Sequence, residues 1–438
     1  MNDSPREEEP LANADIILAG LLSFVVVTAC FWASAHVDNR IIEGSRLTHN
    51  LFDVWFEGDC PRVFNHMTTR VGGEDRTLIH PLFSLAVFPL VKLFRLVGLQ
   101  PLAAVRSLMS AFAGVWAAGL FALLRLIRRR RFESLLFALI GASSAASVFW
   151  FTVPETWAFG SLSILFALIV TAAARYRRIS GWWFVAAQIA SGGMAVTNAM
   201  VALAGTFFAL GMRRALRVTA AAALVGGVLF SMECAVFRST QAGIPSYVPQ
   251  YVFSPGAHGP FAILDSFLLD SVVMPEVNLI PRSEDPGVKF STQDSMPGTG
   301  SGLAGLALVL WTVFLVAGCI GLLRSREPAE QPFRLTLVAS LIGQLAIHLA
   351  YGDETFLYTL HFIPLLICLA SFAGRTRLKP AVPVLALGLL VSLLSSNLSI
   401  FLDTTRELPR VITYNVDAEH QRWAAKGMIL KDGKLIHP

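Results

Sequence analysis

Residues 49–85 concentrate acids, arginines and histidines between two long apolar segments. The first acidic part of this stretch contains Asp53, Glu57 and Asp59. A carboxylate can take the proton of a hydroxyl or amine that attacks a donor, an effect worth roughly 10²–10⁴-fold in rate. We therefore predict a catalytic loop in which one of these three carboxylates is the general base.

Asp59 is the first choice among the three because of its neighbours. Gly58 before it and Pro61 after it predict a turn that places the carboxylate at the start of a helix over residues 62–67. A purely structural role is equally well supported, since Asp is a frequent helix N-cap. The sequence leaves both roles open for Asp59 and keeps Asp53 and Glu57 as alternative bases.

Arginines in and after this stretch are candidates for binding a phosphate, because a guanidinium matches phosphate oxygens with a planar fork. The candidates are Arg62, Arg70 and Arg106. Arg106 lies one turn inside an apolar run, where a charge at mid-helix costs roughly 2.5–3.5 kcal/mol on insertion scales. The alternative is that Arg106 reaches the lipid headgroups from near the end of its helix.

Four further polar residues beside apolar runs are candidate substrate-binding groups: His80, Glu155, Tyr358 and His361. Pro81 suits the first turn of a helix, which leaves His80 unexplained. Glu155 either interacts with a helix dipole or faces the same cavity as the acids. For Tyr358 and His361, hydrogen bonding between packed helices is the alternative to contact with a lipid phosphate.

The composition of the chain is that of an integral membrane protein. Of its 438 residues, 54% are hydrophobic and 15% are charged, whereas soluble domains carry about 25% charged residues. The mean hydropathy is +0.60, and several apolar runs reach the roughly 17–25 residues that cross a bilayer as a helix. We predict an all-α polytopic membrane protein whose surroundings are the lipid bilayer. The net charge of +5 comes from arginines beside apolar runs, which indicates topology rather than binding of nucleic acid.

The apolar runs predict about eleven transmembrane helices. Their ranges are 15–34, 102–126, 132–151, 157–174, 182–196, 199–212, 218–237, 303–323, 335–350, 356–372 and 381–402. Basic flanks should all lie on the cytoplasmic side; they are residues 128–131, 175–178, 213–217, 324–326 and 375–379. To keep all five flanks on that side, residues 182–212 must form two short helices that meet at Thr197-Asn198. For the same reason residues 80–97 cannot be a span, and we predict that they form an amphipathic helix along the outer interface.

The resulting topology places the N-terminus in the cytoplasm and the C-terminus in the periplasm of a bacterial inner (plasma) membrane. The predicted transmembrane unit covers residues 1–402, with a catalytic outer loop at 35–101 and a second outer loop at 238–302. Residues 403–438 are expected to form an outer C-terminal tail.

The order of these features resembles the GT-C superfamily of polyprenyl-phosphate-sugar glycosyltransferases, which includes the protein O-mannosyltransferases and the aminoarabinose transferases of lipid A. The matching elements are an acid in the first outer loop, His80-Pro81-Leu82 at the start of a juxtamembrane helix, and an Arg-x-x-Ser-Ala-like sequence at residues 106–111, near the start of the second span. Cys60 stands where the O-mannosyltransferases have a second acid, and one proline follows His80 where many members have two.

The resemblance implies a GT-C-like bundle with a juxtamembrane helical loop on its outer face. It also implies an inverting glycosyltransferase that takes a sugar from an undecaprenyl-phosphate-type carrier, with Asp59 as general base and Arg106 near the donor phosphate. The acceptor would be a lipid, a glycan or a protein. A divalent metal is compatible with the sequence and not required by it.

A transporter or flippase of lipid-linked sugars is the alternative function. Transporters place ionisable groups near the bilayer midplane on broken helices, commonly in two repeated halves. Here the charged residues gather at the predicted outer boundary and no internal repeat is visible. The sequence therefore favours the transferase. A third hypothesis is a non-catalytic partner in envelope assembly, for which Asp59 would be replaceable.

Overall fold

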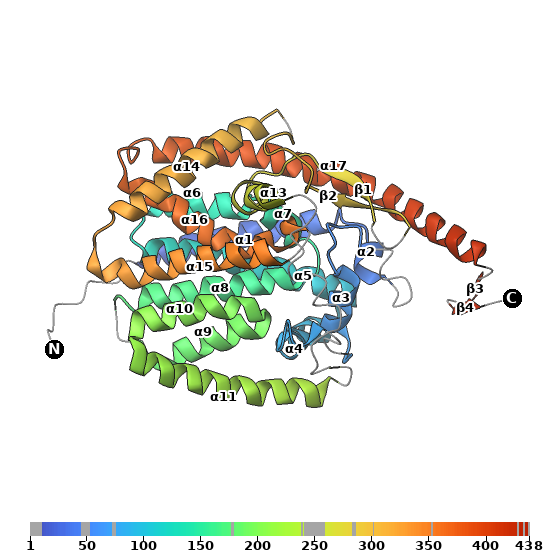
Figure 1. Cartoon of the computed structure of the whole chain (residues 1–438), viewed down its shortest axis with the longest axis horizontal. Coiled ribbons are helices and arrows are strands. Elements are labelled where there is room, and N and C mark those ends of the chain that lie inside the picture. Colours follow the sequence, from blue (N-terminus) through green and yellow to red (C-terminus); the bar gives the residue numbers. More distant parts are fainter. Residues whose placement is uncertain are drawn as a thin grey trace.

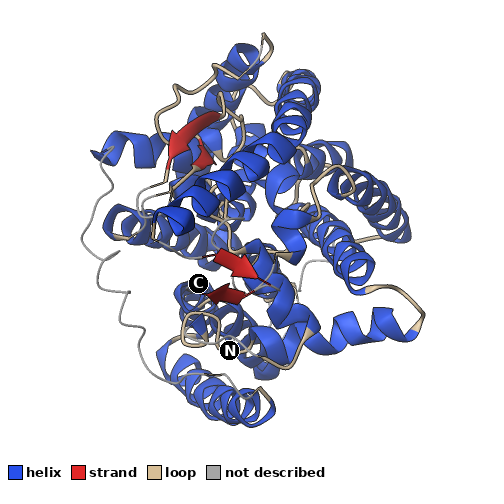
Figure 2. Ribbon diagram, turned by 90° about the vertical axis from the view of Figure 1, so that its right-hand side faces the viewer, coloured by secondary structure: helices blue, strands red, loops and turns tan. Residues whose placement is uncertain are grey.

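The computed structural model is a bundle of long helices with two short strand pairs (Figure 1). The structure describes residues 11–44, 53–71, 76–176, 179–237, 240, 259–282, 286–300, 302–351, 354–426, 429–431 and 434–436. Parts of both predicted outer loops, including residues 45–52, 72–75 and 241–258, lie outside these ranges. Figure 2 shows the helices nearly end-on, with the two strand pairs apart from each other.

Within the described ranges, seven helices are long and apolar enough to cross a membrane, or up to eight if a bent pair forms one span. The seven are α1 (Asn13–Ser34), α5 (Pro101–Leu126), α8 (Thr156–Ala173), α11 (Met212–Val236), α14 (Ala304–Arg324), residues Pro328–Ala350 with η5 (Pro328–Glu330) and α15 (Gln331–Ala350), and α17 (Val382–Ala425). The bent pair joins η6 (Thr355–His361) to α16 (Ile363–Ser371) and η7 (Phe372–Arg375) at 60°. The chain is an all-α multi-pass membrane protein, as predicted, but the prediction of eleven spans is wrong.

The first predicted span that fails is 132–151, which breaks into α6 (Arg131–Ala142) and α7 (Ala145–Trp150). The hydroxyls of Ser144 and Ser147 both donate to the Gly141 carbonyl at 2.7 Å. The backbone N–H groups that open α7 donate to the carbonyls of residues 271 and 272. Apolar side chains continue across this break, so hydropathy alone reads it as one helix.

The other two failed spans form a hairpin of short helices. α9 (Gly181–Met194) has 14 residues and α10 (Ala199–Leu210) has 12, below the roughly 17–25 needed to cross a bilayer. They meet at the 3₁₀ turn η3 (Val196–Asn198), where the sequence predicted the break. Val196 N–H donates to the Ile79 carbonyl at 3.0 Å, and Leu82 N–H donates to the Gly193 carbonyl at 2.9 Å.

Shorter elements gather at one end of the bundle, which we call the loop end. They are α2 (Arg40–Glu43), α3 (Cys60–Thr68), α4 (Phe83–Leu96), α13 (Gly259–Asp265), the π-helical turn η4 (Ser266–Asp270), and the antiparallel pair β1 (Asn278–Pro281) and β2 (Val288–Ser291). In Figure 1 α2, α3, β1 and β2 lie toward the right. A second antiparallel pair, β3 (Ile429–Lys431) and β4 (Lys434–Ile436), follows α17.

α4 is amphipathic, as predicted for residues 80–97. It buries Phe83, Val87 and Val91 on one face. Its N-cap position, Leu82, provides no side-chain hydrogen bond. Glu233 of α11 substitutes by accepting the N–H of Leu85 at 2.6 Å.

α17 continues through the predicted boundary at residues 402–403 and projects beyond the bundle (Figure 1). Most of the predicted tail is therefore part of a 44-residue helix. In this extension, Asn415 pairs with both backbone groups of Val288, through 2.8 Å and 2.9 Å hydrogen bonds. The last helix consequently fixes the hairpin β1–β2 at the loop end.

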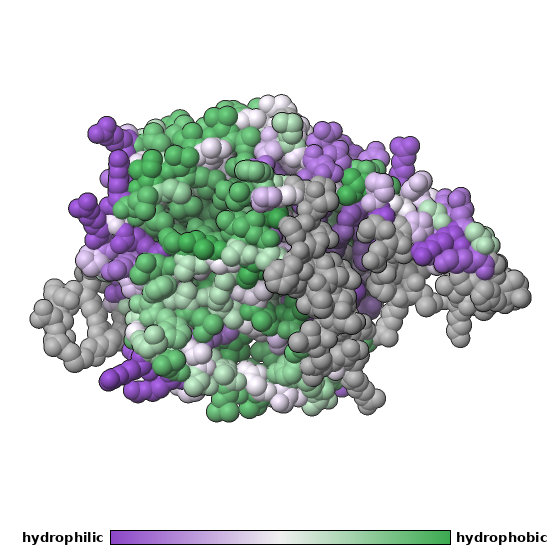
Figure 3. Space-filling view, in the orientation of Figure 1, coloured by the Kyte–Doolittle hydropathy of each residue, from purple (hydrophilic) through white to green (hydrophobic). Residues whose placement is uncertain are grey.

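We call the opposite end of the bundle the arginine end. Here ion pairs with acidic side chains involve three of the five predicted basic flanks. Glu330 pairs with Arg175 at 2.9 Å and also with Arg375. Asp15 pairs with Arg125 at 2.9 Å and with Arg131 at 2.8 Å. Hydrophobic residues cover much of the bundle's side in Figure 3, and hydrophilic residues gather at its left end and on the projecting α17.

Replacing Glu330 with Ala is expected to lower the free energy of unfolding by about 1–3 kcal/mol, because two guanidinium groups lose their shared buried carboxylate while Arg175 keeps its pair with Glu327. The Glu330 side chain is 3% exposed. Thermal unfolding in detergent measures the effect. The control is Glu407→Ala, whose side chain is 56% exposed and 4.0 Å from Arg410, and for which we expect about 0–1 kcal/mol. Equal destabilisation by both variants would contradict a special role of the buried pairs.

Candidate functional site

Residues Asp53–Asp59, which we call the acid loop, follow an unusual backbone path. Phe56 and Glu57 have φ of 51° and 60°, a left-handed conformation that costs roughly 1–2 kcal/mol for a residue with a Cβ. Trp55 and Phe56 are fully buried. Their rings lie 5.4 Å from Phe149 and 5.0 Å from Phe356, respectively. This aromatic packing holds the acid loop in the strained conformation.

Gly58 lets the acid loop approach the start of α8. A β-carbon at this position would lie 3.0 Å from the Trp55 carbonyl oxygen, 3.2 Å from the Trp150 ring and 3.3 Å from Oε1 of Glu155. Each contact is tighter than ordinary van der Waals packing. Glycine therefore allows Glu155 to sit directly against the loop that carries Asp59.

Asp59 occupies the N-cap position of α3, but its side chain makes no capping hydrogen bond. Its carboxylate faces two guanidinium groups instead. Oδ2 lies 3.2 Å from Arg76 and Oδ1 lies 3.5 Å from Arg62. The side chain is 23% exposed, so this carboxylate can be reached from outside the bundle.

Asp53 and Glu155 interact electrostatically with Asp59 and complete what we call the carboxylate cluster. Burial raises the pKa of Asp53 well above its ordinary value, and the negative charge of Asp59 raises it further. Burial and then the charge of Asp59 raise the pKa of Glu155 to about 8. Near neutral pH Glu155 is protonated, and the raised pKa of Asp53 favours its neutral form, beside a carboxylate that is paired with arginines. The three predicted acids of the cluster thus differ in environment, which the sequence could not reveal.

Glu57, the remaining candidate base, pairs with Lys289 of β2. The backbone supports this connection, because Phe290 N–H donates to the Val54 carbonyl at 2.9 Å. Glu57 therefore connects the acid loop to the β1–β2 hairpin. The sequence analysis did not identify Lys289 as its partner.

Glu354, another buried acid, anchors the same hairpin from the turn before η6. Ser291 donates to its Oε2 at 2.7 Å. Burial raises the pKa of Glu354 to about 7, despite the hydrogen bond from Ser291. Thr355 N–H donates to the side chain of Gln293 at 3.3 Å. The second loop is thus attached both to the acid loop and to the membrane-spanning part of the chain.

His80 lies half-buried at the junction between α9 and α8. Its Nδ1 donates to the Met194 carbonyl at 2.6 Å, and its Nε2 lies 3.4 Å from the hydroxyl of Thr156. Burial lowers the pKa of His80 to about 4. A neutral imidazole fixes the position of the residues around it and offers no positive charge to a phosphate.

Tyr358 and His361 lie on η6 and contact His80 indirectly through Trp157. The Trp157 ring lies 4.8 Å from Tyr358, 5.3 Å from His361 and 5.7 Å from His80. His361 is 2% exposed and its Nε2 lies 3.5 Å from the Asn198 amide nitrogen. These contacts favour the alternative in which both residues pack between helices.

The arginine candidates separate in space. Arg62 lies at the carboxylate cluster, as predicted, whereas Arg70 is exposed. Arg106 donates to the Val37 carbonyl at 2.7 Å and interacts with Asp38 and Glu43. No contact between Arg106 and the carboxylate cluster is found among the described residues.

Arg76 is the site residue that the sequence analysis missed. It follows a glycine pair, which indicates an exposed turn. The sequence feature that could have identified Arg76 is its short distance along the chain from His80. The N–H groups of Ile79 and His80 both donate to the Arg76 carbonyl. This short turn links the position of Arg76 to the predicted His80-Pro81 element.

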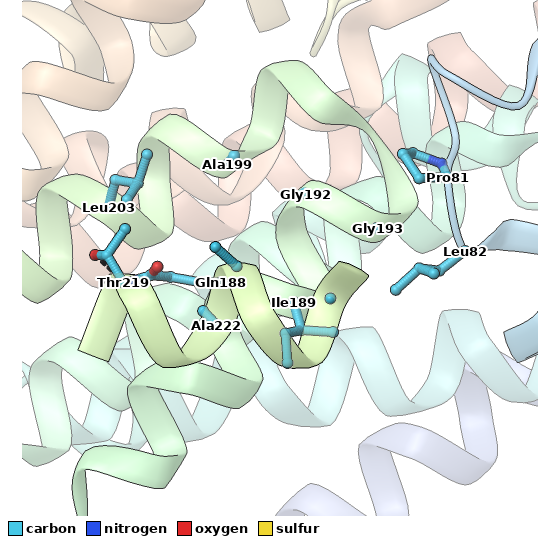
Figure 4. Close-up of a pocket in the computed structure, with 12 residues that line it drawn as sticks. Pro81, Leu82, Gln188, Ile189, Gly192, Gly193, Ala199, Leu203, Thr219 and Ala222 are labelled. Carbon is cyan, nitrogen blue, oxygen red and sulfur yellow. Dashed lines mark hydrogen bonds between the residues drawn. The ribbon is translucent and has the colours of Figure 1, made fainter. Parts of the chain in front are cut away.

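An apolar groove of about 330 Å³ lies next to His80, between α9, α10 and α11 (Figure 4). It is lined by Pro81, Leu82, Gln188, Ile189, Gly192, Gly193, Ala199, Leu203, Thr219, Ala222, Ala223 and Gly226. None of these side chains is charged. The amide of Gln188 is occupied in hydrogen bonds to Thr206 at 2.8 Å and Thr219 at 3.3 Å. The groove therefore suits a hydrocarbon chain.

Among the residues that the structure describes, no group of three or more His, Cys, Asp or Glu side chains is arranged to hold a metal ion. Comparison of the chain with protein-family models, with curated proteins and with solved structures finds no match.

The raised pKa of Glu155 predicts that stability falls with rising pH. The ordinary pKa of this carboxyl group is 4.5, and in the folded protein it is about 8. Between pH 4.5 and pH 8 the folded state therefore holds the Glu155 proton and the unfolded state does not. In this range the free energy of unfolding falls by up to roughly 1.4 kcal/mol for each pH unit. Glu155→Gln should reduce this slope, since an amide has no proton to lose. Thermal unfolding in detergent from pH 5 to pH 9 measures it.

The matched control for this experiment is Glu276→Gln, at an exposed position of the same end of the molecule. It should leave the slope unchanged. If Glu155→Gln and the wild type lose stability in parallel across the whole pH range, Glu155 is not buried as a neutral acid.

Proposed function

We propose that the chain is an integral membrane glycosyltransferase of the GT-C type, which moves a sugar from a polyprenyl-phosphate carrier to an acceptor with Asp59 as general base. One observation carries the proposal. Asp59 is a partly exposed carboxylate held by Arg62 and Arg76 beside two acids whose pKa values are raised by burial, at the end of an apolar bundle. A reaction between an acceptor and a phosphate-linked donor needs a carboxylate for the acceptor's proton and cations for the phosphate within one site.

In this mechanism Asp59 accepts the proton of the acceptor hydroxyl or amine as its oxygen or nitrogen attacks the anomeric carbon. The bond from that carbon to the phosphate oxygen breaks, and its electron pair leaves with the polyprenyl phosphate. Arg62 and Arg76 bind the departing phosphate through their planar donors. Attack from the face opposite the leaving phosphate inverts the anomeric centre.

The other predicted bases fit this role less well. Burial raises the pKa of Asp53 well above its ordinary value, which favours the neutral form. Glu57 is paired with Lys289. The Glu57–Lys289 pair instead connects the acid loop to the β1–β2 hairpin. Asp59 therefore remains the general base in the proposal.

The groove beside His80 supports a donor with a long apolar tail. It is lined mainly by small residues of α9 and α11 and ends at Pro81 and Leu82. Thr156, which neighbours His80, directly follows Glu155 of the carboxylate cluster. A polyprenyl chain in the groove would therefore approach the cluster with its phosphate end.

The proposal places the loop end in the periplasm of a bacterial inner membrane. The arginine end would be cytoplasmic, because cytoplasmic flanks carry the excess of Arg and Lys. The acceptor is then a lipid, glycan or protein presented on the periplasmic side. The β1–β2 hairpin, which is tied to the acid loop, is positioned to contact it.

Asp59→Asn should reduce transfer by roughly 10²-fold or more, because an amide cannot accept the acceptor's proton. The measurement is transfer of label from radiolabelled polyprenyl-phosphate sugars in membranes that contain equal amounts of each protein. Asp403→Asn is the matched control, since that side chain is 64% exposed on α17 and lies outside the cluster. It should retain full activity.

Asp53→Asn and Glu57→Gln complete the series. Full activity in Asp59→Asn, combined with its loss in either of these variants, would transfer the role of base to that residue. If the wild type moves no sugar from any donor in a panel of polyprenyl-phosphate sugars, the transferase proposal fails. Movement of labelled lipid across vesicle membranes would then test the transporter.

Ala223→Phe should raise the KM for donors with long polyprenyl chains, because the new ring fills the open side of the groove. Donors with one or two isoprene units should be affected little, since they reach the cluster without occupying the groove. Leu224→Phe is the control, because its side chain is 72% exposed and does not line the groove. An equal change for long and short donors would show that the groove does not hold the chain.

A further inference from the structure

The C-terminal half of α4 forms an exposed surface that the proposed reaction does not use. We call it the α4 tip and define it as Lys92, Leu93, Arg95, Leu96 and Val97. The three apolar side chains are 61%, 81% and 77% exposed, in chain order. Lys92 and Arg95 are exposed between them. Large apolar side chains and cations thus share one surface.

The positive charge of the α4 tip is not balanced locally. Residues 76–105 contain no acid. No ion pair of the described residues involves Lys92 or Arg95, and Lys92 only approaches the ring of Phe88 at 5.4 Å. The tip therefore presents two cations to whatever surrounds the protein.

The other end of α4 is attached to the bundle. Leu85 N–H donates to Glu233 at 2.6 Å, and Leu82 N–H donates to the Gly193 carbonyl at 2.9 Å. The Phe88 and Phe237 rings lie 5.7 Å apart. The fixed start of the helix directs the tip outward.

The tip lies at the level where α5 enters the bundle. Gly98, with a φ of 92°, turns the chain directly after Val97, and α5 begins at Pro101. The start of a membrane-spanning helix is at the height of the lipid headgroups. The exposed apolar side chains and the cations therefore meet the boundary between acyl chains and phosphates.

We propose that the α4 tip binds anionic phospholipid, with Leu93, Leu96 and Val97 inserted among the acyl chains and Lys92 and Arg95 at the phosphates. Basic amphipathic helices bind membranes through apolar area and through attraction to anionic headgroups. The inference goes beyond the proposed glycosyltransferase activity and does not depend on it.

The test compares the lipids retained by the purified full-length protein. Wild type and the double variant Lys92→Gln/Arg95→Gln are reconstituted in vesicles made of equal parts phosphatidylglycerol and phosphatidylcholine, re-extracted in mild detergent, and analysed for bound lipid by mass spectrometry. The wild type should retain mainly phosphatidylglycerol. The double variant should lower the ratio of phosphatidylglycerol to phosphatidylcholine roughly 5- to 30-fold, the effect of removing two cations from an anionic surface.

The matched control is Arg406→Gln/Arg410→Gln, which removes two exposed arginines from α17, where each has an acidic neighbour. It should leave the ratio as in the wild type. A second variant, Leu93→Ser/Leu96→Ser, should lower the amount of both lipids without changing the ratio. Monodisperse elution and an unchanged melting temperature confirm that each variant is folded.

Equal retention of the two lipids by the wild type would overturn the inference, as would an equal loss of selectivity in the α17 control. Because the readout is bound lipid, neither result depends on whether the protein transfers a sugar.

Discussion

The fold depends on satisfying backbone hydrogen bonds wherever an apolar helix is interrupted. An unpaired N–H or C=O in an apolar environment costs several kcal/mol, so a helix break needs a partner from elsewhere. At the end of α9, residues 79–82 provide it. At the start of α7, residues 271 and 272 provide it. Both partner segments belong to the loops between long helices, so the breaks in the bundle also determine where those loops lie.

The same arrangement explains how several acids can share a small volume. Like charges at close range cannot all remain ionised in a site from which water is largely excluded. Arg62 and Arg76 pair with the carboxylate of Asp59, whereas burial raises the pKa values of Asp53 and Glu155. Three similar side chains thereby acquire different properties. The groove is lined by uncharged side chains only, so the apolar and the charged parts of the site are made by different residues.

Sequence reasoning recovered the features that depend on composition and local pattern. The bounds of α1, α5 and α8 lie close to the predicted apolar runs, and the break between α9 and α10 falls at Thr197-Asn198. The turn at Gly58 and the helix after Asp59 were likewise visible. Contacts between distant segments were not. The break at Ser143-Ser144 depends on residues 271 and 272, and the role of Arg76 depends on the path of the acid loop. No local pattern distinguishes Glu57, which pairs with Lys289, from Asp59, which pairs with two arginines.

The ion pairs at the arginine end join segments that are translated at different times. Arg175 is translated before Glu330, and Arg375 after it, yet Glu330 contacts both. When η5 and α15 first leave the ribosome, only one of the two arginines is available to this carboxylate. The network can close only after η7 has been inserted, because a single remote residue completes it. Late closure of this kind would couple the packing of the early helices to the arrival of the last quarter of the chain.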